Sequence, residues 1–343
     1  MGGRLGGISL AVALFLLLPS ILATAAPTPI AVRTLMPHAP ILIDSDANFT
    51  ATNGVTTGNG SAGNPYIIEG WDINAANGDG VFLRSTTSHV ILRNLSVHDG
   101  GPTYVGILIL YASNVTIQHV NATSSAQGIY VARAADVTVS ASNGSTAQGG
   151  GIGVTTSTRV LIDDNDGWFS EFGIWVNGSS SVAVSNNRLH RNWRGVFVTN
   201  SPSVSISRND VEDNDAGGPG PTMGIGVGWS NGAALSGNVI SSVAQAGISI
   251  EQSTNISLES NRVTQSGVGA QLTASAGLIY GNRFYFNTVQ SIDDTANVWD
   301  GGTRSAGTTG RITTESTIAG GRHRTIVRPR TASEILRTSW AGS

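Results

Sequence analysis

The sequence of 343 residues contains no cysteine and no lysine. Without cysteine the chain can form neither disulfide bonds nor thiolate metal sites, so its stability has to come from a hydrophobic core. Charged residues make up 12% of the chain, about half the share of an average soluble protein. The formal net charge is −3, whereas a nucleic-acid-binding surface needs a basic stripe. We therefore expect no nucleic-acid partner.

Long apolar runs are scarce, and the one that stands out lies at the N-terminus. Arg4 precedes an apolar stretch over residues 8–18, and Ala-Thr-Ala at 23–25 fits a cleavage site for small residues. The sequence therefore predicts a signal peptide over residues 1–25, a secreted or cell-surface (extracytoplasmic) protein and no transmembrane span in the mature chain. An uncleaved membrane anchor is the alternative, although the run is short for a spanning helix.

Glycine is abundant, with 44 residues, and many glycines open a repeated pattern of Gly-apolar-x-apolar. The pattern starts at Gly80, Gly106, Gly128, Gly151, Gly173, Gly195, Gly224, Gly247 and Gly269. Four of the eight intervals are 22 residues, which is typical of a solenoid. A second alternating apolar pair and a third apolar position follow in most repeats, and β-branched residues dominate them. We predict an all-β fold: a right-handed, single-stranded parallel β-helix of about nine coils with three short strands per coil.

The alternation also predicts the direction of side chains within a coil. Ile174, Val176, Val182 and Val184 occupy inward positions, and Trp175 occupies an outward position.

A column of asparagine supports the stacked arrangement. Counting 14 residues from the opening glycine gives Asn94, Asn165, Asn187, Asn209, Asn238 and Asn261, and Asn282 falls one position earlier in its repeat. Asparagine tolerates the left-handed conformation of turns, and stacked amides bond to one another along a solenoid. The column therefore predicts a structural ladder at one turn of the coil.

The segment before the coils carries a family resemblance. Residues 58–71 read GNGSAGNPYIIEGW. This run resembles the N-terminal segment of secreted NosD-like β-helix proteins with the pectin-lyase fold, particularly archaeal ones, and the resemblance covers about residues 39–300. In these relatives the run leads into the first strand and covers the open end of the helix. The resemblance implies an N-terminal capping segment over residues 26–66 and a parallel β-helix over 67–300.

The family takes its name from a periplasmic protein implicated in delivering copper to nitrous oxide reductase. A copper site requires clustered His, Met or Cys, but the six histidines are scattered and there are three methionines. Copper handling is therefore the weakest of the functional alternatives. We predict no metal site and no cofactor, and nothing in the sequence favours Ca²⁺.

The C-terminal residues 301–343 differ from the coils. They hold seven of the 19 arginines, two acidic residues and no apolar periodicity, so we expect a disordered, Arg-rich tail. Read one base out of phase, codons for Thr303 onward can encode YPVGGNYWSDY, which resembles the continuation of the relatives after Trp-Asp. We hypothesise a shifted reading frame near Gly302; a genuine Arg-rich linker is the alternative.

Polar and aromatic residues gather in three consecutive coils. The candidates for substrate binding are Trp168, Glu171, Trp175, His190, Arg191, Trp193, Phe197, Asp213 and Asp215. We hypothesise that the aromatic and histidine members form one continuous surface that contacts sugar. The alternative is a purely structural ladder of charges, because Arg188 lies one coil from both Asp166 and Asp210.

Two functions of different kinds remain open. The preferred one is an exported, non-catalytic β-helix protein, expected to be a monomer, that binds a polysaccharide, a cell-surface glycan or a partner along its flank. The alternative is a carbohydrate-active enzyme, either a polysaccharide lyase or a glycoside hydrolase of the pectin-lyase fold, in which carboxylates perform acid and base chemistry. No catalytic motif is recognisable, so no catalytic residue is assigned, and the fold alone cannot decide.

Overall fold

The structure, a computed structural model, describes residues 34–214, 221–295, 297–299 and 302–303. The predicted signal peptide lies outside these residues, as do Asp215 and nearly all of the predicted tail. Within the described ranges, no helix is long and apolar enough to cross a membrane.

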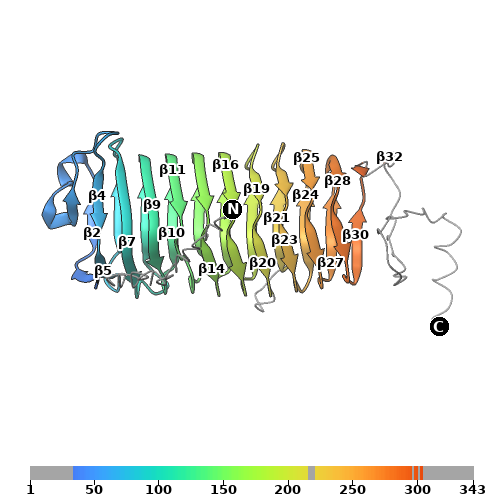
Figure 1. Cartoon of the computed structure of the whole chain (residues 1–343), viewed down its shortest axis with the longest axis horizontal. Helices are drawn as coiled ribbons and strands as arrows, with labels where there is room; N and C mark the ends of the chain where they lie inside the picture. The colour runs from blue at the N-terminus through green and yellow to red at the C-terminus, as the bar shows by residue number, and fades with distance from the viewer. Residues whose placement is uncertain (1–33, 215–220, 296, 300–301, 304–343) are drawn as a thin grey trace, which may run out of the picture. The chain divides into compact units, whose positions relative to one another are not determined.

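The described strands build a parallel β-helix of about ten turns, which confirms the predicted fold class (Figure 1). Three sheets run along it, and a right-handed turn fits this fold. The eleven-stranded sheet contains β2 (Ile41–Ile43), β6 (Val81–Arg84), β8 (Val105–Leu110), β10 (Gln127–Ala132), β12 (Gly150–Thr155), β15 (Phe172–Asn177), β18 (Arg194–Thr199), β21 (Met223–Gly228), β24 (Ala246–Glu251), β27 (Val268–Thr273) and β30 (Val289–Asp293).

The other two sheets complete the coils, and the smaller one contributes only from Asp166 onward. The fifteen-stranded sheet contains β1 (Met36–His38), β3 (Val55–Thr57), β4 (Tyr66–Glu69), β5 (Trp71–Asn74), β7 (Val90–His98), β9 (Ser113–Ala122), β11 (Ala135–Ser140), β13 (Thr158–Asp163), β16 (Ser180–Ser185), β19 (Ser205–Ser207), β22 (Ala234–Ser236), β25 (Thr254–Glu259), β28 (Ala276–Tyr280), β31 (Val298–Trp299) and β32 (Gly302–Thr303). The six-stranded sheet contains β14 (Asp166–Trp168), β17 (Arg188–His190), β20 (Asp210–Glu212), β23 (Val239–Ser241), β26 (Arg262–Thr264) and β29 (Arg283–Tyr285).

The N-terminal segment contributes to these sheets. Strands β1 and β2 already pair in parallel with β5 and β6, so parallel pairing begins well before residue 67. Two short 3₁₀ helices, η1 (Asp46–Asn48) and η2 (Ala51–Asn53), follow, and β3 pairs antiparallel with β4. Phe49 and Val55 pack against the core at this end of the solenoid.

The coils stack in register, so each inward residue lies on its counterpart in the next coil. Ile152, Ile174 and Val196 align across β12, β15 and β18. Ile174, Val176 and Val184 are fully buried, Val182 nearly so, and Trp175 lies half-exposed on the outer face, which confirms the predicted register.

The opening glycines permit close stacking of the coils. A Cβ atom on Gly173 would lie 2.8 Å from the carbonyl oxygen of Gly195, and one on Gly195 would lie 2.6 Å from that of Gly224. Any side chain there would push neighbouring coils apart, which explains why glycine recurs at the repeat start.

The asparagine column forms a hydrogen-bonded ladder from Asn165 to Asn282. Each side-chain amide donates to the Oδ1 atom of the next asparagine at 2.9–3.0 Å and also to a backbone carbonyl. Asn94 does not belong to it. Asn94 is exposed and lies inside β7, which runs unbroken from Val90 to His98, so this coil lacks the separate turn that the ladder occupies.

Two further polar columns were not predicted. At a second turn the backbone N–H of Ser170 donates to Asn192 Oδ1, and the backbone N–H of Asn192 donates to Asn214 Oδ1 in the next coil. At a third turn each serine hydroxyl accepts a bond from the backbone N–H of the preceding member; the column is Ser157, Ser179, Ser201, Ser230, Ser253 and Ser275. Counting serines at the repeat interval could have revealed it.

Candidate functional site

The outer face of the eleven-stranded sheet carries two rows of outward side chains. Strand register aligns Tyr130, Gly153, Trp175, Phe197 and Gly226 in one row. The second row lies near the starts of the same strands and contains Gln127, Gly150, Phe172, Arg194 and Met223.

One ring in these rows stacks on two others. Phe172 stacks on Trp175 with ring centroids 5.9 Å apart and planes 25° apart, and on Phe197 at 5.5 Å and 27°. All three rings are partly exposed. We call Tyr130, Phe172, Trp175, Arg194 and Phe197 the aromatic platform.

Glycines let two of the rings lie across the sheet. A Cβ atom on Gly153 would lie 2.8 Å from Cδ2 of Tyr130, and one on Gly226 would lie 2.8 Å from Cδ2 of Phe197. Each ring therefore covers a glycine of the next coil. Tyr130 reaches Thr155 in that coil, where the two hydroxyl oxygens are 3.0 Å apart.

Arg194 is the charged member of the platform. Its guanidinium carbon lies 5.0 Å from the ring centroids of Phe172 and Phe197 and 4.4 Å from Trp193. Burial lowers the pKa of Arg194, and the nearby Glu171 carboxylate, 3.6 Å from Nη1, opposes that shift. The buried Nε atom has no hydrogen-bond partner within the structure as described.

The structure brings together only part of the predicted site. Glu171, Trp175 and Phe197 meet at the platform. Trp193 is 6% exposed, so the prediction that it contacts sugar is wrong; its ring is covered and lies against the Arg194 guanidinium. Phe172 and Arg194 were missed, although each lies three residues before a predicted aromatic residue on the same outward face.

The remaining candidates lie around a corner. Trp168 and His190 belong to β14 and β17 of the six-stranded sheet, with ring centroids 5.5 Å apart. The predicted single continuous surface is therefore split, because the chain changes sheet between Trp168 and Phe172. Arg191 and Asp213 are exposed in left-handed conformations at this corner, and the Arg191 guanidinium lies 5.7 Å from the Phe169 ring centroid.

A pair of carboxylates lies on the outer face of the six-stranded sheet. Asp210 and Glu212 are aligned with Arg188 and His190 of the preceding coil. Arg188 Nη2 donates to Glu212 Oε1 at 3.3 Å. The Asp210 side chain is exposed to solvent. Partial desolvation nevertheless raises its pKa, and the charge of Glu212 raises it further. The positive charges of Arg188 and Arg262 oppose this rise. Such a group could exchange protons with a ligand.

The described residues do not fit a copper site. Among them, no three His, Cys, Asp or Glu side chains are grouped so that they could hold a metal ion. The two described methionines, Met36 in β1 and Met223 in β21, are separated by most of the coils. The soft ligands that copper prefers are therefore not assembled in this part of the chain.

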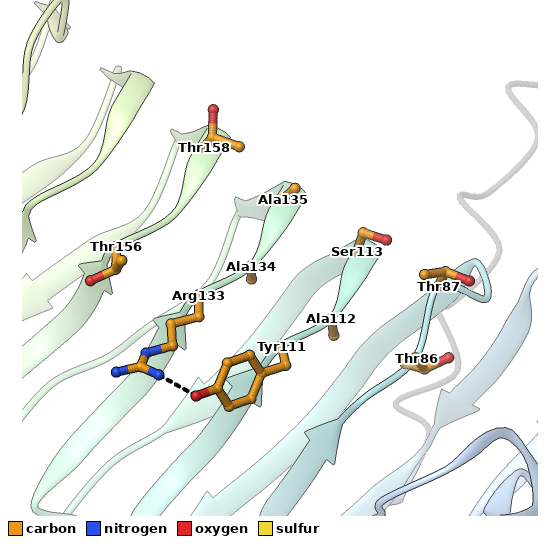
Figure 2. Close-up of a pocket in the computed structure, with 10 residues that line it drawn as sticks. All are labelled: Thr86, Thr87, Tyr111, Ala112, Ser113, Arg133, Ala134, Ala135, Thr156 and Thr158. Atoms are coloured by element: carbon orange, nitrogen blue, oxygen red, sulfur yellow. Dashed lines mark hydrogen bonds between the residues drawn. The ribbon is translucent and has the colours of Figure 1, made fainter.

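A pocket of about 410 Å³ opens at another corner, where strands of the eleven-stranded sheet end and strands of the fifteen-stranded sheet begin. We call it the corner pocket. Its lining residues are Thr86, Thr87, Tyr111, Ala112, Ser113, Arg133, Ala134, Ala135, Thr156 and Thr158. Figure 2 shows Tyr111 and Arg133 side by side on one wall, with the Arg133 guanidinium donating to the Tyr111 hydroxyl.

Solved structures of similar fold come from proteins that act on carbohydrates or belong to phages. A point mutant of the periplasmic alginate epimerase AlgG matches with a TM-score of 0.51 and 15% identity, covering 65% of this chain and 62% of its own. The A-module of the mannuronan C-5 epimerase AlgE4 from Azotobacter vinelandii has a TM-score of 0.51 and 13% identity, covering 71% of this chain and 84% of its own.

A longer phage protein shares the fold as well. Tailspike protein 2 of the Escherichia coli O157:H7 bacteriophage CAB120 has a TM-score of 0.56 and 13% identity, covering 78% of this chain and 42% of its own. The match therefore covers less than two thirds of the length of this AlgG mutant and of the tailspike. At these identities the likeness shows the fold alone.

Sequence comparison gives a more specific result. No curated protein matches the chain. The family model NosD, described as periplasmic copper-binding protein, matches residues 42–219 and 118–322 and so covers most of the sequence. The chain belongs to the NosD family.

Proposed function

We propose that this protein is an exported, non-catalytic β-helix protein that binds glycans through the aromatic platform. The observation that carries the proposal is the stacking of Phe172 on both Trp175 and Phe197, all three partly exposed, beside the largely buried Arg194 side chain. A sugar presents a flat face of C–H groups with hydroxyls at its edge. Such a face suits an aromatic surface with a few polar groups beside it.

The rigidity of the platform supports this proposal. Its rings lie on strands that pair on both sides, and Tyr130 and Phe197 are seated over glycines. Ordering these side chains on binding therefore costs little conformational entropy. Similar β-helices named as alginate and mannuronan epimerases support a polysaccharide as the ligand, and the periplasmic description of the family supports an extracytoplasmic location.

A glycan array with the mature protein tests the proposal. For any glycan retained, Trp175→Ala and Phe197→Ala should each weaken binding at least about tenfold, because each removes an exposed aromatic contact. Trp229→Ala is the matched control, since Trp229 is an exposed aromatic at a corner of another coil and should have no effect. Unchanged affinity in both platform variants would refute the role of the platform.

A second candidate function is a carbohydrate-active enzyme. The observation that favours it is the Asp210–Glu212 pair beside His190, in which one carboxyl has a raised pKa and its partner accepts a hydrogen bond from Arg188. Lyases and hydrolases both require groups that give and accept protons. Product analysis of every bound polysaccharide should reveal cleavage that Asp210→Asn abolishes; intact polysaccharide after prolonged incubation would eliminate this candidate.

A further inference from the structure

The corner pocket has a small-residue floor and a polar rim. Ala112 and Ala134 lie buried at the corner, and their small side chains leave the hollow between the coils open. Hydroxyl groups of threonine and serine surround this floor (Figure 2). The lining surface is more apolar than polar, and the hydroxyl groups and the Arg133 guanidinium supply its donors and acceptors.

One positive charge in this pocket is not balanced by an acidic group. Arg133 donates to the neutral Tyr111 hydroxyl, and its guanidinium carbon lies 5.3 Å from the Tyr111 ring centroid. In the ranges that the structure describes, no carboxylate lies within ion-pair distance of Arg133. Arg159 contrasts with it, since Asp136 accepts two bonds from that guanidinium at 2.6 and 2.7 Å.

Two carboxylates border the corner pocket, and neither forms an ion pair with Arg133. Asp136, next to Ala135, is held by Arg159, which lowers the pKa of that carboxyl. Asp46 accepts a bond from the Thr86 hydroxyl at the other end of the pocket. Arg133 therefore retains donors for an anion from outside, and a guanidinium fork suits carboxylate or sulfate oxygens.

The corner pocket is continuous with the aromatic platform. Tyr130 of the platform meets Thr155 at 3.0 Å between hydroxyl oxygens, and the next residue, Thr156, lines the pocket. Tyr111, Arg133 and Thr156 are successive members of one left-handed corner column. Arg133 follows Tyr130 by three residues, about 10 Å along the strand direction, and Trp175 lies two coils, about 10 Å, further along the solenoid axis. One oligosaccharide can therefore span both.

We propose that the corner pocket binds an anionic sugar unit, bearing a carboxylate or a sulfate, of the same glycan that stacks on the platform, with Arg133 and Tyr111 as its contacts. This inference rests on the proposed function for the ligand being a saccharide. The corner pocket would make the protein prefer acidic over neutral glycans, and this preference would come from a site outside the aromatic platform.

Calorimetric titration of the mature protein with three matched oligosaccharides tests this: an oligogalacturonate, its methyl ester and a sulfated oligosaccharide. The native protein should bind at least one anionic ligand about tenfold more tightly than the neutral ester, and that preference should weaken with added salt. Arg133→Gln should reduce anionic binding to the level of the ester and leave ester binding unchanged. The relative affinity of the uronate and sulfated ligands distinguishes carboxylate from sulfate.

Control variants separate this inference from the proposed function. Arg208→Gln removes an exposed arginine at a different corner, whose Nε donates to Asn186, and should preserve the preference. Trp175→Ala should weaken all three ligands equally. Equal binding of anionic and neutral ligands, or an unchanged preference in Arg133→Gln, would overturn the pocket assignment while leaving the platform intact. Loss of binding to every saccharide would overturn both.

Discussion

One asparagine side chain per coil connects three backbone segments of the ladder. Asn187 donates to Asn209 Oδ1 at 2.9 Å and to the carbonyl of Ile162 at 3.0 Å. Its own Oδ1 accepts from both the backbone N–H and the side-chain amide of Asn165. Because the site is buried, water cannot replace these bonds, and each buried group left unpaired is costly.

We predict that Asn187→Ala lowers the free energy of unfolding by about 2–4 kcal/mol, since it leaves donors of Asn165 buried without a partner. Chemical denaturation followed by circular dichroism measures this. Asn77→Ala is the matched control, because Asn77 is exposed, lies outside the ladder and does not have a left-handed backbone, and its effect should stay within about 0.5 kcal/mol. Equal effects in the two variants would contradict the role of the ladder.

At the scale of the strand, glycine has two different roles, and replacing glycine with alanine at different positions can separate them. The opening glycines face the backbone of the next coil, whereas Gly153 and Gly226 lie on the outer face beneath rings of the platform. The first role belongs to folding, and the second sets how the rings lie.

Gly226→Ala should therefore disturb the site without unfolding the coil. The new Cβ would meet the Phe197 ring and the end of the Met223 side chain, both of which can move. We expect glycan affinity to fall about fivefold with a stability change below about 1 kcal/mol. Gly195→Ala, whose Cβ would meet the Gly224 carbonyl, should cost about 3 kcal/mol. Full glycan affinity in a stable Gly226→Ala variant would refute this use of glycine.

At the scale of the whole solenoid, the sequence predicts the repeating features well. The period-2 alternation placed Ile174 inward and Trp175 outward because in-register stacking leaves few other arrangements. The part of the site built at corners could not be predicted. Alternation stops at a turn, so it could not show that Trp193 is buried beside Arg194 or that Trp168 lies on another sheet from Trp175.

The missed platform residues have a related cause. Phe172 and Arg194 precede the opening glycines of their repeats, so a template that starts at glycine does not include them. Strict alternation extended backwards from Trp175 and Phe197 would place them inward, but the alternation breaks at the opening glycine, where two consecutive residues are buried. Alternation alone therefore could not have found either residue.

Burial of a charge in one coil should affect the whole stack, because each coil is stabilised mainly by its two neighbours. Ile174 is fully buried between Ile152 and Val196, so Ile174→Asp places an unpaired carboxylate in the core and interrupts both coil interfaces. We expect loss of the cooperative unfolding transition and of strand content by circular dichroism. Trp175→Asp, one residue further along and facing outward, should keep the fold and lose only glycan binding. A folded Ile174→Asp variant with native strand content would show that the coils do not depend on a continuous apolar core.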